Sequence, residues 1–265
     1  MKKMKNKIML FIFLLTTVFS FAQKTISASD ILKDIKAGKT ITIKDATIKG
    51  VLDFTYMEDA LEKLPRTKKN SWFFWISGNS TNQIEKSIDI RISFTNCTFK
   101  NDVFAYIPDE DSGYTFTANF EDEAIFKNCN FERKAMFKYS EFEKDADFSG
   151  TTFNYDTTFK YARFEREIDF SNTVFNEAAI FKYTKFNRNV RFSNAIFKDS
   201  ATFKYAQFYD GVSFNNTQFE EDLNIKYMQV SGDFNIANMS VAYEIDSKYT
   251  KINGKSFGQY LINKK

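Results

Sequence analysis

Residues 135–164 read AMFKYSEFEKDADFSGTTFNYDTTFKYARF, and the spacing of their phenylalanines decides the fold. From Phe137 the next phenylalanines follow at alternating steps of five and six residues, and the alternation continues without a break to Phe219. An amphipathic helix needs steps of three and four and an ordinary strand needs steps of two, so neither explains the pattern. It predicts short faces joined by corners, with two five-residue and two six-residue steps completing one four-sided coil. Such coils stack into a parallel β-solenoid with a rise of about 4.8 Å per coil.

The repeat unit also resembles that of a known family. ADFSG at 146–150 and ARFER at 162–166 fit a unit of one small residue, one polar residue, a central Leu or Phe and two further polar positions. In this respect the chain resembles the pentapeptide-repeat superfamily over about residues 41–241, with two interruptions. The resemblance implies an all-β fold, a right-handed quadrilateral β-helix, which we expect to have about seven coils and a short N-terminal capping helix. The chain departs from the usual unit by an extra residue on every second face and by its nearly exclusive Phe centres.

The N-terminus predicts export. Residues 1–22 contain four lysines, then an apolar run, and end with small residues at positions 20 and 22, as in a secretory signal peptide. We therefore expect a periplasmic or extracellular protein that is not an integral membrane protein. Loss of these four lysines changes the formal net charge from +3 to −1. A nearly neutral chain argues against a nucleic-acid partner, which calls for a large positive excess.

The rest of the chain divides into a solenoid, two insertions and two caps. Residues 23–40 are expected to form an N-terminal cap with a helix that begins at Ser29 and stops at Gly38. Insertions are expected at about 57–87 and 107–118, and they should pack together because both leave the solenoid after the same face on neighbouring coils. Residues 242–265 are expected to break the register and form a C-terminal cap. In that cap we predict a tight turn at Asn253–Gly254, with Phe257, Tyr260, Leu261 and Ile262 available to cover the last coil.

Several columns of residues that lie one coil apart are better explained by structure than by chemistry. Asn and Gly recur at one corner, at positions 128, 150, 172, 194, 216 and 238, which predicts a turn with positive φ. Cys97 and Cys129 occupy matching positions, where reduced core thiols are favoured over a disulfide. Asp147 and Asp169 also stack, and a solvated charge lattice is favoured over a catalytic pair or a Ca²⁺ site.

A lysine column beside a tyrosine column is the strongest candidate for binding. Its pairs recur once per coil in the sequence FKY or IKY, and Tyr56 and Tyr106 align with them upstream. A second candidate is the aromatic stretch SWFFW at 71–75, which is either a ligand platform or, as favoured, a small satellite core. The candidate ligand-binding residues are Lys138, Tyr139, Lys160, Tyr161, Lys182, Tyr183, Lys204, Tyr205, Lys226, Tyr227, Trp72 and Trp75.

Two interpretations of the lysine column remain open at this point. In the first, mobile ammonium groups spread into water above the tyrosine rings. In the second, because the neighbouring columns leave the charge uncompensated, the column is a strip that binds an anionic glycan, a lipid head group or an acidic protein.

The composition argues against catalysis. The chain has no His, and its two Cys do not form a CxxC pair, so imidazole chemistry and a zinc site are not expected. We predict a secreted non-catalytic scaffold, monomeric or homodimeric, with a binding or structural role and with no cofactor, metal or catalytic residue. The alternative is a β-helix enzyme that processes an anionic polysaccharide.

Overall fold

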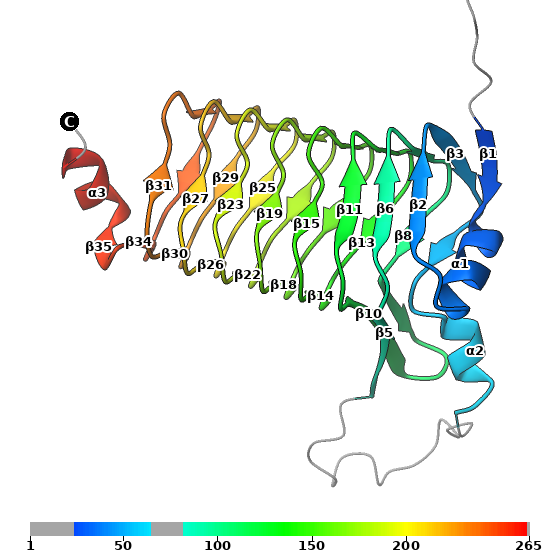
Figure 1. Ribbon diagram of the computed structural model, residues 1–265. Coiled ribbons are helices and arrows are strands. Elements are labelled where there is room, and N and C mark those ends of the chain that lie inside the picture. The colour runs from blue at the N-terminus through cyan, green and yellow to red at the C-terminus, as the bar shows by residue number, and fades with distance from the viewer. Residues whose placement is uncertain (1–23, 65–81, 264–265) are drawn as a thin grey trace, which may run out of the picture.

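The computed structural model describes residues 24–64 and 82–263, which form a four-sided solenoid built from four parallel sheets (Figure 1). Sheet A contains β1 (Lys24–Ser27), β3 (Ala46–Lys49), β7 (Thr98–Phe99), β12 (Asn130–Phe131), β16 (Thr152–Phe153), β20 (Val174–Phe175), β24 (Ile196–Phe197), β28 (Gln218–Phe219) and β32 (Ser240–Val241). Sheet B contains β2 (Ile41–Lys44), β6 (Ile92–Thr95), β11 (Ala124–Lys127), β15 (Ala146–Asp147), β19 (Ile168–Asp169), β23 (Val190–Arg191), β27 (Val212–Ser213) and β31 (Phe234–Asn235).

The other two sides are sheets C and D. Sheet C contains β4 (Leu52–Asp53), β8 (Val103–Phe104), β13 (Ala135–Met136), β17 (Thr157–Thr158), β21 (Ala179–Ile180), β25 (Ala201–Thr202), β29 (Leu223–Asn224) and β33 (Ile245–Asp246). Sheet D contains β5 (Gln83–Ile88), β10 (Tyr114–Phe120), β14 (Glu141–Phe142), β18 (Arg163–Phe164), β22 (Lys185–Phe186), β26 (Gln207–Phe208), β30 (Gln229–Val230), β34 (Lys251–Ile252) and the antiparallel β35 (Lys255–Ser256). The helices are α1 (Ala28–Lys36), α2 (Met57–Leu61) and α3 (Phe257–Asn263).

The phenylalanines fill the interior and set the register. Phe153 pairs with Phe175 and Phe164 with Phe186, so each anchor lies beside its equivalent on the next coil. The Phe181 side chain is fully buried, and its ring stacks 5.2 Å from that of Phe159 between centroids. Because rings also meet edge to face across the core, each ring contacts neighbours in its own column and in others. The predicted inward anchors are therefore confirmed.

The five-residue and six-residue steps correspond to two kinds of corner. At the five-residue corners a tight β-turn forms, as where the Ala162 N–H donates to the Phe159 carbonyl at 2.9 Å. The extra residue of the six-residue step lies at the other two corners. The Asn and Gly column does have positive φ, for example 58° at Asn172 and 67° at Gly150, as predicted.

Inward threonines join successive coils through their hydroxyl groups. Thr173 Oγ1 donates to the Phe148 carbonyl at 3.0 Å, and Thr184 Oγ1 donates to the Phe159 carbonyl at 2.7 Å. Each bond crosses to the coil before, so the hydroxyl gains a partner although the side chain is completely buried. Polar residues are therefore tolerated at the small inward position.

The solenoid is longer than the sequence pattern suggested. Sheets B and C each contain eight strands, so the described residues form eight coils rather than about seven. The prediction that the register breaks after residue 241 is wrong: β33 pairs with β29, and β34 pairs with β30. The last coil was missed because its inward phenylalanines are replaced, while Lys248 and Tyr249 still continue the corner pattern.

Both ends carry caps that differ in detail from the expected ones. The capping helix α1 is confirmed, but it begins one residue after Ser27, whose side chain accepts the Ser29 N–H at 3.2 Å. The turn at Asn253–Gly254 is confirmed by the antiparallel pairing of β34 and β35. Beyond it the chain forms α3, which buries Phe257 and leaves Ile262 74% exposed, so Ile262 does not cover the core.

The two insertions meet in one sheet. β9 (Tyr106–Asp109) and β10 form an antiparallel hairpin, and β5 at the end of the first insertion pairs in parallel with β10 from Gln83 to Ile88. Figure 1 shows that β5 and β10 extend beyond the side of the solenoid near its N-terminal end. The expectation that the insertions pack together is confirmed for these segments.

Candidate functional site: a lysine–tyrosine ladder

The lysine and tyrosine columns lie at the corner between sheets C and D. On each coil the pair occupies the two central positions of a tight β-turn, such as Lys160 and Tyr161 between Phe159 and Ala162. We call this feature the lysine–tyrosine ladder. Its rungs are Lys138–Tyr139, Lys160–Tyr161, Lys182–Tyr183, Lys204–Tyr205, Lys226–Tyr227 and Lys248–Tyr249.

Every tyrosine of the ladder has a left-handed backbone. Its φ lies between 60° and 65°, for example 61° at Tyr183 and 64° at Tyr249. For a residue other than Gly, Asn or Asp this conformation is rare and costs on the order of 1 kcal/mol or more. The sequence pattern predicted positive φ only for the Asn corner, because aromatic residues do not signal it. The ladder thus repeats a costly choice on six coils.

The tyrosine rings form one continuous stack. Centroids of neighbouring rings are 5.0 Å apart for Tyr139 and Tyr161 and 4.6 Å apart for Tyr205 and Tyr227, with the planes within 4° of parallel. Tyr249 extends the stack at 4.8 Å, tilted by 23°. Because each inner ring is covered on both faces, the surface shows ring edges and hydroxyl groups. An aromatic edge carries partial positive charge.

The N-terminal end of the tyrosine column differs from the prediction. Tyr106 belongs to β9 and contacts the Tyr139 ring at 5.8 Å with a 51° tilt, and its hydroxyl accepts a hydrogen bond from Lys138 Nζ at 2.9 Å. Tyr56 is only 9% exposed, and its hydroxyl donates to the Leu32 carbonyl of α1 at 3.0 Å. The exposed ladder therefore starts beside Tyr106 and does not include Tyr56.

The lysines lie against the rings instead of spreading freely. The distance from Nζ to the centroid of the adjacent tyrosine is 5.1 Å for both Lys160 and Lys182 and 5.5 Å for Lys204. The side chains are half-buried. Desolvation, followed by repulsion from Lys138 and Lys182, lowers the pKa of Lys160 below its usual range. An anion placed on the ladder would relieve that repulsion.

Charge compensation is uneven along the ladder, which corrects the view that the whole column is uncompensated. Lys226 Nζ lies 3.7 Å from an oxygen of Asp246, a residue of the last coil. Arg163, which adds charge beside the column, lies 3.6 Å from Glu141. Among the residues that the structure describes, Lys138, Lys160, Lys182, Lys204 and Lys248 have no carboxylate at ion-pair distance. Four consecutive uncompensated rungs therefore precede the compensated Lys226, and Lys248 lies beyond it.

The hydroxyl group of Tyr205 is available as a hydrogen-bond donor. Desolvation, and then the neighbouring Tyr227 and Tyr183, raise the pKa of Tyr205, which keeps the phenol protonated. Ammonium groups, phenol hydroxyl groups and ring edges all present positive character to an approaching molecule. The ladder is thus suited to an anion and not to stacking against an exposed aromatic face. Trp72 and Trp75, the other candidate residues, lie outside the described residues.

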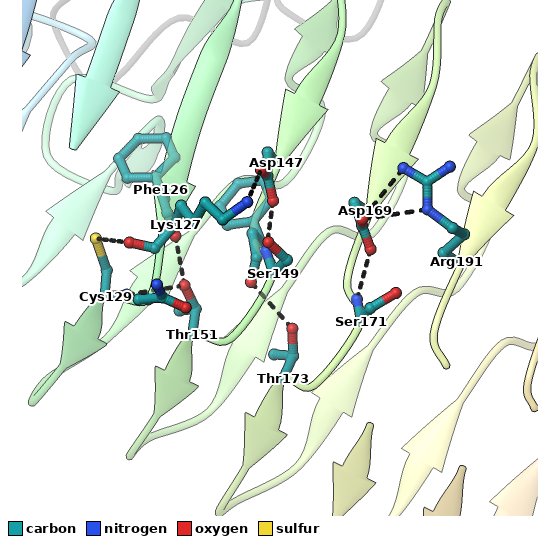
Figure 2. A network of polar contacts seen from close by, with 12 residues as sticks. Phe126, Lys127, Cys129, Asp147, Ser149, Thr151, Asp169, Ser171, Thr173 and Arg191 are labelled. Carbon is teal, nitrogen blue, oxygen red and sulfur yellow. Dashed lines mark hydrogen bonds and ion pairs between the residues drawn. The ribbon is translucent and has the colours of Figure 1, made fainter. Parts of the chain in front are cut away.

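The stacked Asp147 and Asp169 have a structural role (Figure 2). Each carboxylate accepts a backbone N–H two residues on, from Ser149 and Ser171, at 2.7 Å. Arg191 lies 3.1 Å from Asp169. Both carboxylates therefore hold the Asn corner and its charge lattice together, as the favoured interpretation had it.

The two cysteines are free and buried in the core. Cys129 Sγ lies 3.5 Å from the Phe94 carbonyl, in the place where threonine hydroxyl groups bond the preceding coil. It also lies 3.4 Å from the Lys127 carbonyl (Figure 2). Burial raises the pKa of the Cys129 thiol. Both thiols belong to the buried core, and each donates to backbone carbonyls there.

Sequence reasoning missed Lys248–Tyr249 and the role of Asp246. The signal for the first was present, because KY recurs one full coil after Lys226–Tyr227. Asp246 was missed because position 224 in the same column is Asn and the last coil was not assigned. Among the described residues no group of three or more His, Cys, Asp or Glu side chains could hold a metal ion.

The fold and the ladder together define a class of protein: a regular four-sided β-solenoid whose outer surface carries repeated side chains in columns. The profile of the family described as pentapeptide repeats matches residues 116–163, 137–185, 159–206 and 181–228, with nine copies of the repeat. This stretch belongs to the pentapeptide-repeat superfamily, and the predicted right-handed quadrilateral β-helix is confirmed. Searches of curated proteins and of solved structures found no significant match. In the part of the chain that the structure describes, no helix has the length and apolar character needed to cross a membrane.

Proposed function

We propose that the protein is an exported, non-catalytic scaffold that binds an anionic glycan along the lysine–tyrosine ladder. Pentapeptide-repeat proteins are generally structural or binding proteins and not enzymes, which agrees with this role. Export rests on the signal-peptide pattern of residues 1–22. The single observation that carries the binding role is the row of stacked tyrosines in left-handed conformation beside four uncompensated lysines.

The tyrosines are not required by the turn itself. At the opposite corner the same kind of turn is built from Asn172, Asn194 and Asn216, which tolerate positive φ better than Tyr. Asn194 Nδ2 donates to Asn172 Oδ1 at 3.2 Å, so an amide ladder stabilises such a corner as well. The tyrosine is strained in this conformation and is repeated on every coil of the ladder, although asparagine would form the same turn with less strain. This repetition points to a function at the surface.

The ladder fits a glycan better than the other two partners considered. A lipid surface is usually bound by apolar side chains that insert beside the basic ones. Among the described residues the exposed aliphatic side chains, Val51, Leu261 and Ile262, lie on the first and last segments and not along the ladder. An extended acidic peptide presents alternate side chains on one side about 6.6 Å apart, out of step with rungs about 4.8 Å apart.

The alternative of a polysaccharide-processing enzyme gains no support from the carboxylates. The stacked pair Asp147 and Asp169 is engaged in turn hydrogen bonds and, for Asp169, in contact with Arg191. General acid catalysis would need a carboxylic acid held protonated near a scissile bond. Glu141 has a raised pKa, mainly from desolvation, but it lies 3.6 Å from Arg163 on an open side of the solenoid.

A glycan array probed with the mature chain, residues 23–265, tests the proposal. We expect binding to uronic-acid polymers and little binding to neutral glycans. The triple variant Lys160→Gln, Lys182→Gln and Lys204→Gln should lose most of the binding. A matched triple variant, Lys134→Gln, Lys144→Gln and Lys198→Gln, removes the same charge from exposed lysines at other corners and should keep it. Equal loss in both variants, or no retained acidic glycan, contradicts the proposal.

A further inference from the structure

We propose that the ligand is a linear polyanion that lies parallel to the solenoid axis and contacts four rungs, Lys138 to Lys204, and that Asp246 sets the end of this site. The inference rests on the proposed function and adds the direction, the length and the boundary of the bound ligand. It follows from the register of the rungs, from the two ends of the ladder and from the pattern of charge compensation.

Backbone pairing fixes one rung directly beside the next. The Tyr161 N–H donates to the Lys182 carbonyl and the Tyr183 N–H to the Lys204 carbonyl, each at 3.0 Å. The rungs therefore repeat at the strand spacing of about 4.8 Å, and three steps span about 14 Å. The stacked rings agree with this spacing, since neighbouring centroids are 4.6 to 5.0 Å apart from Tyr139 to Tyr227. A straight row of equal charges is matched by a straight polymer that carries charge at regular intervals.

The row is rigid before any ligand binds. Each inner ring is held between two neighbours, and the Nζ of each of the four lysines lies 4.8 to 5.5 Å from the centroid of the adjacent tyrosine ring. Little side-chain freedom is then lost on binding, which increases the affinity obtained from each rung. Since the contacts add along one molecule, affinity should rise with each added unit of the ligand until the row is filled.

Both ends of the four-rung row have a physical cause. At one end Tyr106 is 8% exposed and accepts a hydrogen bond from Lys138, and the β9–β10 hairpin leaves the solenoid there. At the other end Asp246 lies 3.7 Å from Lys226 and compensates its charge. Asp246 also accepts the Lys248 N–H through Oδ1 at 3.2 Å.

A conservative substitution at position 246 should alter only the end of the four-rung site. One coil earlier, Asn224 Oδ1 accepts the Lys226 N–H at 3.1 Å, so an amide serves the same turn without a charge. The substitution Asp246→Asn should therefore keep the fold and free Lys226 to act as a fifth rung, which would join the four-rung row to Lys248. Such a gain of binding is hard to obtain from a variant that is merely damaged.

The experiment measures the affinity of oligogalacturonates of two to eight sugars for the mature protein by calorimetry at low salt. We expect affinity to rise with length and to level off once the ligand spans four rungs. Asp246→Asn should move this plateau to a longer ligand and tighten the longest oligomers several-fold while leaving the disaccharide unchanged. Lys226→Gln should change wild-type affinity less than two-fold, whereas Lys182→Gln, in the middle of the row, should lower it at least ten-fold for the longest oligomers.

The outcomes separate the two proposals. If acidic oligomers bind and the Lys182→Gln variant loses affinity, but length has no effect or Asp246→Asn leaves the plateau in place, the axial four-rung site is wrong and the binding face stands. If no acidic oligomer binds, or if only anionic vesicles or acidic proteins bind, both proposals are wrong.

Discussion

The substitution Phe181→Ala tests how the core holds the coils together. The Phe181 side chain is completely buried, with ring centroids at 5.2 Å from Phe159 and 4.9 Å from Phe203 in its own column. It also meets Phe170 and Phe192 edge to face at 5.4 and 5.3 Å. Removing a fully enclosed Phe leaves a cavity, and such changes cost about 3 to 5 kcal/mol of unfolding free energy. The ring contacts on four sides favour the upper part of that range.

The measurement is equilibrium unfolding in urea, followed by circular dichroism in the β region. We expect a lower midpoint with an unchanged dependence on urea, because the unfolded state exposes nearly the same surface. The matched variant Phe181→Leu keeps much of the buried volume and should cost clearly less. A loss below about 1 kcal/mol for Phe181→Ala would show that the cavity is not formed and that the ring is not enclosed as described.

Three further results are expected. Asn194→Ala should lower stability by about 1 kcal/mol in urea unfolding, because φ is 59° there and an alanine is strained; no change would contradict the turn. Cys97 and Cys129 are at most 2% exposed, so a thiol reagent should label them in denaturant and not in native buffer; rapid native labelling would place them at the surface. Lys160→Gln should raise the melting temperature slightly at low salt and not at high salt, because the lowered pKa of Lys160 reflects desolvation and repulsion from Lys138 and Lys182; a lower melting temperature would mean that the lysine stabilises the corner.

The fold was predictable because its signal is both periodic and redundant. Each phenylalanine from Phe137 to Phe219 marks one face, so the register is over-determined and a single exception does not obscure it. The last coil was not recognised because this redundancy ends there, with Ile236, Val241 and Ser247 at the positions that Phe occupies in earlier coils. The N-terminal boundary of α1 differed because two serines, Ser27 and Ser29, are both good caps and only tertiary packing chooses between them.

The candidate site was predictable only as a list of residues. The regular stacking of coils placed the lysines and tyrosines in columns, but it could not show that the rings cover one another's faces and expose their edges. The left-handed backbone of Tyr183 has no signature in composition, since Tyr is uncommon there. The pairing of Lys226 with Asp246 needed the last coil, so the charge of the column was overestimated. The sequence pattern alone did not contain the spatial relations between side chains of neighbouring columns.

The central claim, that the ladder is the binding surface, is tested most directly by lysine footprinting. A protein comprising residues 23–265 is acetylated under limiting conditions with and without polygalacturonate, and modification of each lysine is measured by mass spectrometry. We predict that the ligand slows acetylation of Lys160, Lys182 and Lys204 several-fold and leaves acetylation of Lys134, Lys144 and Lys198 unchanged. Equal protection of both sets, or protection of the second set alone, would contradict it.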